Sequence, residues 1–245
     1  MRPFLAALSV LSVLPLGKFA ATEQDLKRAL PFFPVAGLLF GALGWGAAEL
    51  LTRGFPPAVA AMFCAVLPEA LTKGFHLDGL ADTADGFLSG RTRERKLEIM
   101  RDSRTGSMGV AAVFALLGLK AAACLSFPPE LLPAAFGLSL LAGRCGLLFH
   151  IATSRYARPD GLGGIWFQIN PYPALVPATL FPVAAGWLLF GIPGVGAVLA
   201  VLLCAALWSL VTKRVIGGAT GDTIGCSEEC SELLLLLALL LLLPR

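Results

Sequence analysis

The chain consists largely of apolar stretches about 20 residues long, the length that an α-helix needs to cross the hydrocarbon layer of a membrane. Short segments with Gly, Pro or charged residues separate these stretches. The candidate spans are residues 29–51, 55–71, 107–127, 131–153, 174–191 and 192–212. Apolar residues make up 57% of the chain, charged residues only 14%, and the mean hydropathy is +0.80, all outside the range of soluble globular domains. The sequence therefore predicts an all-α fold: a polytopic bundle of about six to eight membrane helices in a single domain, residues 1–245.

Two further apolar segments, 4–16 and 233–243, are too short to span by themselves. The second can lengthen by running back to Cys226. The first has Arg2 before it and Lys18 directly after it, which favours a short interfacial or re-entrant helix over a cleaved signal peptide.

Charged residues gather in the segments 18–28, 73–104 and 213–232, with a smaller group at Arg155 and Arg158. If successive spans alternate in direction, all of these segments lie on one face of the membrane. The positive-inside rule makes that face cytoplasmic. We therefore expect 73–107 and 213–232 to be cytoplasmic active-site segments, the former a helical loop.

Other residue types exclude several functions. The six cysteines lie mostly within apolar runs and form no C-x-x-C pair, so they predict buried packing residues rather than a zinc site or a disulfide framework. The net charge of +3 is spread over the flanks of the spans, and no basic patch laced with aromatic residues is present. Nucleic acid is therefore not expected as a partner.

The segment 74–109 holds charge that the rest of the chain avoids. Of the 19 basic and 16 acidic residues of the chain, twelve lie between Asp78 and Arg104. Asp78, Asp82 and Asp85 are spaced i, i+4 and i+7, so on a helix the three carboxylates share one stripe. Their mutual repulsion costs free energy unless a cation lies among them, and oxygen-only ligands suit a hard ion such as Mg²⁺. The pattern predicts a magnesium site, which usually serves a polyphosphate substrate.

The remainder of this segment predicts two helices, 76–87 and 92–102, the second lying on the membrane surface. Its basic run 91–96 fits lipid headgroups and substrate phosphate equally well. Arg101, Asp102 and Arg104 precede the next span, where a helix start provides either a phosphate site or simply a charged cap.

A second acidic stripe follows a glycine-rich turn at 217–225. Asp222, Glu229 and Glu232 share a helix face by spacings of seven and three, and the G-K-[ST] ending of a P-loop is absent.

Three polar residues lie within apolar spans. Arg144 needs an anionic partner, either a carboxylate of the metal cluster or a substrate diphosphate, unless it snorkels. Lys120 is expected to snorkel outward, and His150 to lie at the interface.

Five blocks in this order resemble the adenosylcobinamide-GDP ribazoletransferase family, also called cobalamin synthases. They are FPVAG at 33–37, HLDGLADTADG at 76–86, LEIMRDSR at 97–104, YARPDG at 156–161, and GGATGDTIG at 217–225 with Glu229. The resemblance covers nearly the whole chain, and the second and third blocks are long and specific. It implies a magnesium-dependent enzyme of the inner membrane that joins adenosylcobinamide-GDP to α-ribazole or its 5′-phosphate and releases GMP.

The resemblance also implies roles for individual residues. The implied metal ligands are Asp78, Asp82 and Asp85, with Asp222 and Glu229. The implied catalytic residues are Asp82, Asp85 and Asp102, and the general base is either the third aspartate of the stripe or Asp102. The implied substrate-binding residues are His76, Arg101, Arg104, Arg144, Arg158 and Thr220, while Thr220, Asp222 and Glu229 complete the metal site or bind the ribazole. Small or apolar residues are usual in the family where this chain has Cys226, Ser227 and Glu228, so the motif acid is matched to Glu229. Besides the substrates and the bilayer, a second copy of the chain or other enzymes of cobalamin assembly remain open as partners.

Two alternatives differ in observable ways. A CDP-alcohol phosphotransferase also uses aspartates and magnesium at a membrane, but its pattern places Ala-Arg where this chain has Ala81 and Asp82. A divalent-cation transporter would carry acidic residues near midspan, whereas here they are expected at span ends beside arginines.

Overall fold

The computed structural model describes residues 1–14 and 16–244, and these residues form helices with no β-strand. The helices are α1 (Arg2–Leu11), α2 (Glu23–Lys27), η1 (Leu30–Phe32), α3 (Phe33–Gly54), α4 (Pro57–Thr72), α5 (Phe75–Leu88), α6 (Arg93–Ile99), α7 (Ser107–Leu125), α8 (Leu132–Thr153), η2 (Leu162–Gln168), α9 (Tyr172–Ile216) and α10 (Gly221–Leu242). Proline occupies the first turn of α3, α4, α8 and α9, where its missing N–H costs no helical hydrogen bond. The all-α prediction is confirmed.

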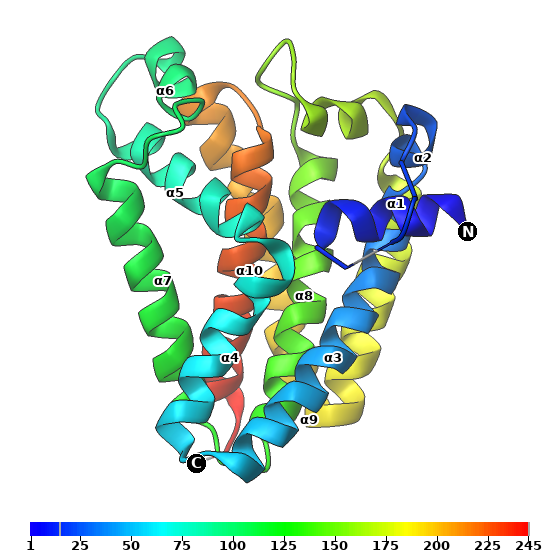
Figure 1. Ribbon diagram of the computed structural model, residues 1–245, viewed down its shortest axis with the longest axis vertical. Helices are drawn as coiled ribbons and strands as arrows, with labels where there is room; N and C mark the ends of the chain where they lie inside the picture. Colours follow the sequence, from blue (N-terminus) through cyan, green and yellow to red (C-terminus); the bar gives the residue numbers. More distant parts are fainter. Residues whose placement is uncertain (15, 245) are drawn as a thin grey trace.

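The long helices run up and down in one bundle, with α8 at its centre (Figure 1). Nearly all of α8 is buried. It packs closely on α3 because glycines replace side chains at the crossing: a Cβ on Gly41 would lie 2.8 Å from the carbonyl oxygen of Gly137. Close backbone approach at small residues is the usual way that membrane helices associate.

The helix α9 is two arms folded back on each other. Gly191 has φ 62° and ψ −140°, which breaks the helix where the expected spans 174–191 and 192–212 meet. A Cβ on Gly186 would lie 2.8 Å from the carbonyl oxygen of Gly194, so the two arms touch at glycine.

Within the described residues, four helices are long and apolar enough to cross a membrane, or five spans if the bent pair α4 and α5 counts as one. The expected six to eight membrane helices are reached when the arms of α9 are counted separately and α10, with its four acidic residues, is included. The chain is thus a multi-pass membrane protein.

The helix α1 lies across the bundle rather than along it (Figure 1), as an interfacial helix does. Its Arg2 pairs with Asp25 of α2 at 2.8 Å. Position 15 of the predicted 4–16 segment lies outside the described residues.

The charged segments gather at one end of the bundle, as the alternation of spans predicts. Figure 1 shows α6, the far end of α5, the start of α10 and the loop before η2 at the same end, with the last turn of α10 at the other. The polar site is therefore assembled there.

Candidate functional site

The site begins at a sharp bend between α4 and α5. Lys73 and Gly74 both adopt left-handed backbone conformations, with φ 54° and 65°, and the two helices meet at 96°. Glycine takes this conformation without steric cost, whereas it is uncommon for lysine. The bend turns α5 across the bundle, so that its polar face meets α10.

Glycines set the crossing of α5 and α10. A Cβ on Gly79 would lie 2.7 Å from the carbonyl oxygen of Asp222, and a Cβ on Gly225 would lie 3.0 Å from the Cα of His76. Only residues without side chains permit this approach, which explains why glycine follows Asp78. The crossing brings the aspartates of α5 beside Asp222.

Asp82 lies at the centre of the resulting carboxylate group. The charges that act on it include those of Asp222, Asp78 and Asp85, together with the cation of Arg158. Arg158 Nη2 donates to Asp222 Oδ2 at 2.8 Å. The side-chain carboxylates of Asp78 and Asp82 accept no hydrogen bond from any other described residue. We call this set the aspartate group: Asp78, Asp82, Asp85 and Asp222. It combines the whole of the first predicted acidic stripe with one residue of the second, Asp222.

The carboxylate of Asp85 also binds backbone amides at the start of α7. Its Oδ2 accepts from the N–H of Gly106 at 2.6 Å, and its Oδ1 accepts from the N–H of Gly109 at 2.9 Å. A carboxylate bound to the free amides of a helix N-terminus stabilises that helix. Asp85 thus ties α5 to α7.

The predicted arginines at the membrane boundary pair with exposed acids. Arg104 binds Asp102 at 2.7 Å within the same turn, and Arg101 binds Asp160 of the loop after α8. The hydrogen bonds from Arg104 hold the pKa of Asp102 down at about 2.

The structure corrects the expectation for Lys120, whose side chain does not snorkel, and it shows which anionic partners Arg144 has. Lys120 is 3% exposed and donates to Glu229 Oε2 at 2.6 Å and to Glu232 Oε2 at 2.8 Å. Arg144 is 1% exposed, lies 2.5 Å from Glu228 Oε1 and also binds Glu232. Its guanidinium stacks over the ring of Phe40 at 4.6 Å. Arg144 therefore has the expected anionic partners, but they are glutamates of α10 and not the aspartate group.

We call this set the ion cluster: Glu69, Lys120, Arg144, Glu228, Glu229 and Glu232, with His76 at its edge. Among the described residues, His76, Glu228 and Glu229 form the one group of three potential metal ligands whose atoms lie within 4.8 Å of one another, a spacing the aspartate group does not reach. However, Glu228 is already paired with Arg144, and Glu229 with Lys120. Because these cations already compensate the two negative charges, a bound metal ion would stabilise this group less than it would stabilise the aspartate group. We assign the ion cluster a structural role and keep the aspartates as the metal candidates.

Three further residues lie where sequence reasoning did not place them. Glu229 belongs to the ion cluster, about two helical turns from Asp222. Thr220 is fully buried as the N-cap of α10, where its Oγ1 accepts from the N–H of Thr223. His150 is buried rather than interfacial, and one ring nitrogen lies 3.3 Å from Thr223 Oγ1.

The sequence reasoning also missed Glu69 and the importance of Glu228. The signal that could have found them is a pairing rule: acids on some apolar helices require buried cations on others. His76 is buried against Glu228 of α10, with its Nδ1 3.1 Å from Oε2.

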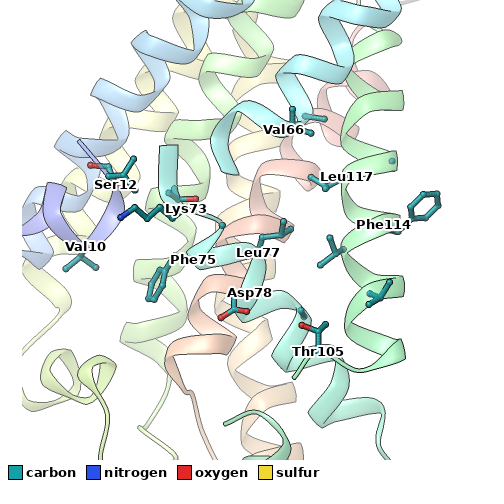
Figure 2. Close-up of a pocket in the computed structure, with 18 of the residues that line it drawn as sticks. Val10, Ser12, Val66, Lys73, Phe75, Leu77, Asp78, Thr105, Phe114 and Leu117 are labelled. Carbon is teal, nitrogen blue, oxygen red and sulfur yellow. The ribbon is translucent and has the colours of Figure 1, made fainter. Parts of the chain in front are cut away.

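A large cavity of 1380 Å³ opens beside Asp78. Figure 2 shows its walls, with Val10 and Ser12 of the N-terminal segment on one side, Phe114 and Leu117 of α7 on the other, and Asp78 and Thr105 as polar groups. Apart from these and Lys73, its lining is mostly apolar. An aspartate thus faces a space large enough for a sizeable substrate.

Comparison with known proteins decides the family. A model of the cobalamin-5-phosphate synthase family matches residues 3–240. The chain belongs to this family. No solved structure matches it.

Several curated relatives agree with this assignment. The adenosylcobinamide-GDP ribazoletransferase of Geotalea daltonii is 35% identical over 98% of this chain and 97% of its own length. Proteins of the same name from Citrobacter koseri and Klebsiella pneumoniae strain 342 are 38% and 40% identical, again over 97% or more of each chain. This member of the cobalamin-5-phosphate synthase family is an enzyme of the transferase class.

Proposed function

We propose that this transferase joins adenosylcobinamide-GDP to α-ribazole, or to its 5′-phosphate, with release of GMP. The relatives are named adenosylcobinamide-GDP ribazoletransferases, and they match at least 97% of this chain. The observation that carries the proposal within this chain is the crossing of α5 and α10, which places Asp82 among Asp78, Asp85 and Asp222.

The donor set fits magnesium. It consists of carboxylate oxygens from two helices, and its central member, Asp82, has no hydrogen-bond donor among the other described residues. Hard divalent cations prefer such oxygen ligands and keep part of their water shell, which tolerates carboxylates that are not in direct contact with each other. We propose that Asp82, Asp85 and Asp222 hold Mg²⁺. When bound, the ion would neutralise the charge that develops on the diphosphate.

The reaction forms a bond from a ribose oxygen of the ribazole to the cobinamide-side phosphorus and breaks the bond from that phosphorus to the oxygen that leaves with GMP. The ribose hydroxyl must lose its proton to a base. Asp102 is a poor base because Arg104 keeps its pKa near 2. Asp85 uses both oxygens on the amides of α7. We propose that Asp78 is the base that accepts this proton. Its carboxylate oxygens accept no hydrogen bond from the other described residues, and it lines the large cavity.

Arg158 and Arg101 are suited to bind phosphate oxygens. Arg158 bonds to Asp222 and therefore lies at the edge of the aspartate group, and Arg101 reaches the same loop through Asp160. Fixed guanidinium groups bind phosphate oxygens with charge-assisted hydrogen bonds and stabilise charge in the transition state.

We further propose that this face is cytoplasmic and that the membrane is the inner membrane. The support is the gathering of the basic segments 73–104 and 213–214 at one end of the bundle, together with the positive-inside rule.

The test is release of GMP from adenosylcobinamide-GDP by purified protein with α-ribazole and Mg²⁺. Asp82→Asn should lower the rate by about 100-fold or more, since it removes the central charge of the metal set. Glu98→Gln is the matched control, because it removes an exposed carboxylate on the same face whose one salt-bridge partner among the described residues is Arg95. Near-normal turnover of folded Asp82→Asn protein would remove Asp82 from the metal site.

A further inference from the structure

A second cavity lies beside the aspartate group, at the end of the bundle that carries the charged segments. Its volume is 410 Å³, within the range of about 300–1,000 Å³ that small-molecule sites occupy. Residues of the loop 154–161 and of η2 line it. The metal assignments above make no use of this space.

The walls of the cavity are held in place by the backbone. The N–H of Ala157 donates to Ala219 at 2.8 Å, and the N–H of Ala219 donates to Arg155 at 2.7 Å, so the loop is tied to the turn before α10. Gly161, with φ 128°, and Gly164 pack against the ring of Tyr156, where a Cβ on Gly164 would lie 3.0 Å from the ring. A loop fastened in this way forms a binding surface before any ligand arrives.

The lining combines aromatic rings with charged groups. Tyr156 and Phe167 lie side by side with ring centroids 5.2 Å apart. Burial raises the pKa of the Tyr156 hydroxyl, so it remains neutral and can donate a hydrogen bond. Arg155 and Arg158 provide positive charge, and Asp160 provides a carboxylate. Flat aromatic faces, cations and a carboxylate are the groups that recognise the base and the phosphate of a nucleotide.

Arg158 connects the cavity to the reacting groups. It lines the cavity while its Nη2 reaches Asp222, and its Nε is buried with no hydrogen-bond partner among the described residues. A buried donor without a partner costs free energy, and a phosphate oxygen would satisfy it. A ligand in the cavity would therefore place its phosphate next to the aspartate group.

We propose that this cavity binds the guanosine monophosphate part of the substrate, with its phosphate at Arg158, its base against Tyr156 and Phe167, and its guanine edge at Asp160. The inference rests on the proposed function, which supplies a guanine nucleotide as the leaving group. Guanine presents two neighbouring donors, N1–H and the 2-amino group, which a carboxylate can accept together. Adenine has an acceptor at N1 and lacks the amino group, so it cannot make this pair. Asp160 binds Arg101 through Oδ1 only, which leaves lone pairs for the base.

Photolabelling of the full-length protein in detergent with 8-azidoguanosine 5′-monophosphate and Mg²⁺ tests this assignment. We expect label on residues 154–168, with protection by excess GMP. Protection by AMP should require about tenfold higher concentration, since a bidentate pair discriminates between bases by about this factor or more. Asp160→Asn should remove most of that difference, whereas Glu98→Gln, which also breaks an exposed pair with an arginine, should preserve it.

The outcomes separate the two proposals. Label elsewhere, or no label that GMP displaces, in protein that releases GMP from adenosylcobinamide-GDP would overturn the cavity assignment and leave the function standing. Equal GMP preference in Asp160→Asn and unaltered protein would also overturn the assigned contact to guanine. Specific label at 154–168 in protein that catalyses no GMP release would support the subsite and contradict the proposed reaction.

Discussion

Replacing Lys120 with methionine should destabilise the bundle strongly. Methionine keeps most of the side-chain length but removes the charge. In the structure, Lys120 Nζ bonds to two glutamates at 2.6 and 2.8 Å and lies 3.6 Å from Glu69 Oε1. Glu229 and Glu232 are each 2% exposed. Without Lys120, Glu232 would retain Arg144, whereas Glu229 would lose the one cation within 4 Å of it among the described residues.

Breaking a buried ion pair by removing one partner costs about 3–5 kcal/mol, because the other charge remains buried and unpaired. We expect the Lys120→Met variant to lose that amount of unfolding free energy. The measurement is equilibrium unfolding by SDS in mixed micelles, followed by circular dichroism. Adding Glu229→Gln to Lys120→Met should recover part of the loss, since it removes the charge left unpaired.

Arg53→Met is the matched control. Arg53 bonds to Glu49 at 2.5 Å, but the two side chains are 76% and 39% exposed, so the loss should stay below about 1 kcal/mol. If Lys120→Met costs no more than this control, the cluster is hydrated rather than desolvated, which would refute the predicted loss of about 3–5 kcal/mol.

Three further predictions concern the helix crossing, the N-terminal helix and the metal. Gly79→Ala should lower stability by about 1–3 kcal/mol and reduce GMP release, because its Cβ would lie 2.7 Å from the carbonyl oxygen of Asp222. The control Gly46→Ala, whose Cβ would have nothing within 4 Å, should be neutral or slightly stabilising. Equal effects of the two variants in thermal unfolding would contradict the close crossing of α5 and α10. Hydrogen bonds from Arg2 lower the pKa of Asp25 below its ordinary value of 3.8, so its contribution is present at neutral pH and is lost as the pH falls below that value. Asp25→Asn should therefore increase protease cleavage near α1 at pH 7, and unchanged cleavage would show that the pair does not hold α1. Removal of Mg²⁺ with EDTA should abolish GMP release and added Mg²⁺ should restore it, while full turnover in EDTA would refute the metal assignment.

Local rules predicted much of the fold correctly. Each membrane helix must satisfy its own backbone hydrogen bonds in lipid, so apolar length alone indicates where spans lie. The break at Gly191 falls at the junction of two expected spans, because a glycine there can take the positive φ that a tight reversal needs. The stripe of Asp78, Asp82 and Asp85 also follows from helical periodicity within one segment.

The partners of those side chains could not be predicted in the same way. Periodicity states which residues share a face of one helix, but which face of another helix they meet depends on where two backbones approach most closely. Here Gly79 and Gly225 permit the close approach of α5 and α10, so Asp222 lies beside the aspartates of α5. Glu229, seven residues later on α10, instead forms an ion pair with Lys120.

The sequence by itself therefore determined the membrane class, the helices and the one end of the bundle at which charge collects, because these depend on hydrophobic length and on periodicity along a single segment. Only the tertiary structure decided that Lys120 and Arg144 lie buried among glutamates. A charge inside a membrane protein must find an opposite charge, and that choice depends on neighbours distant in the chain.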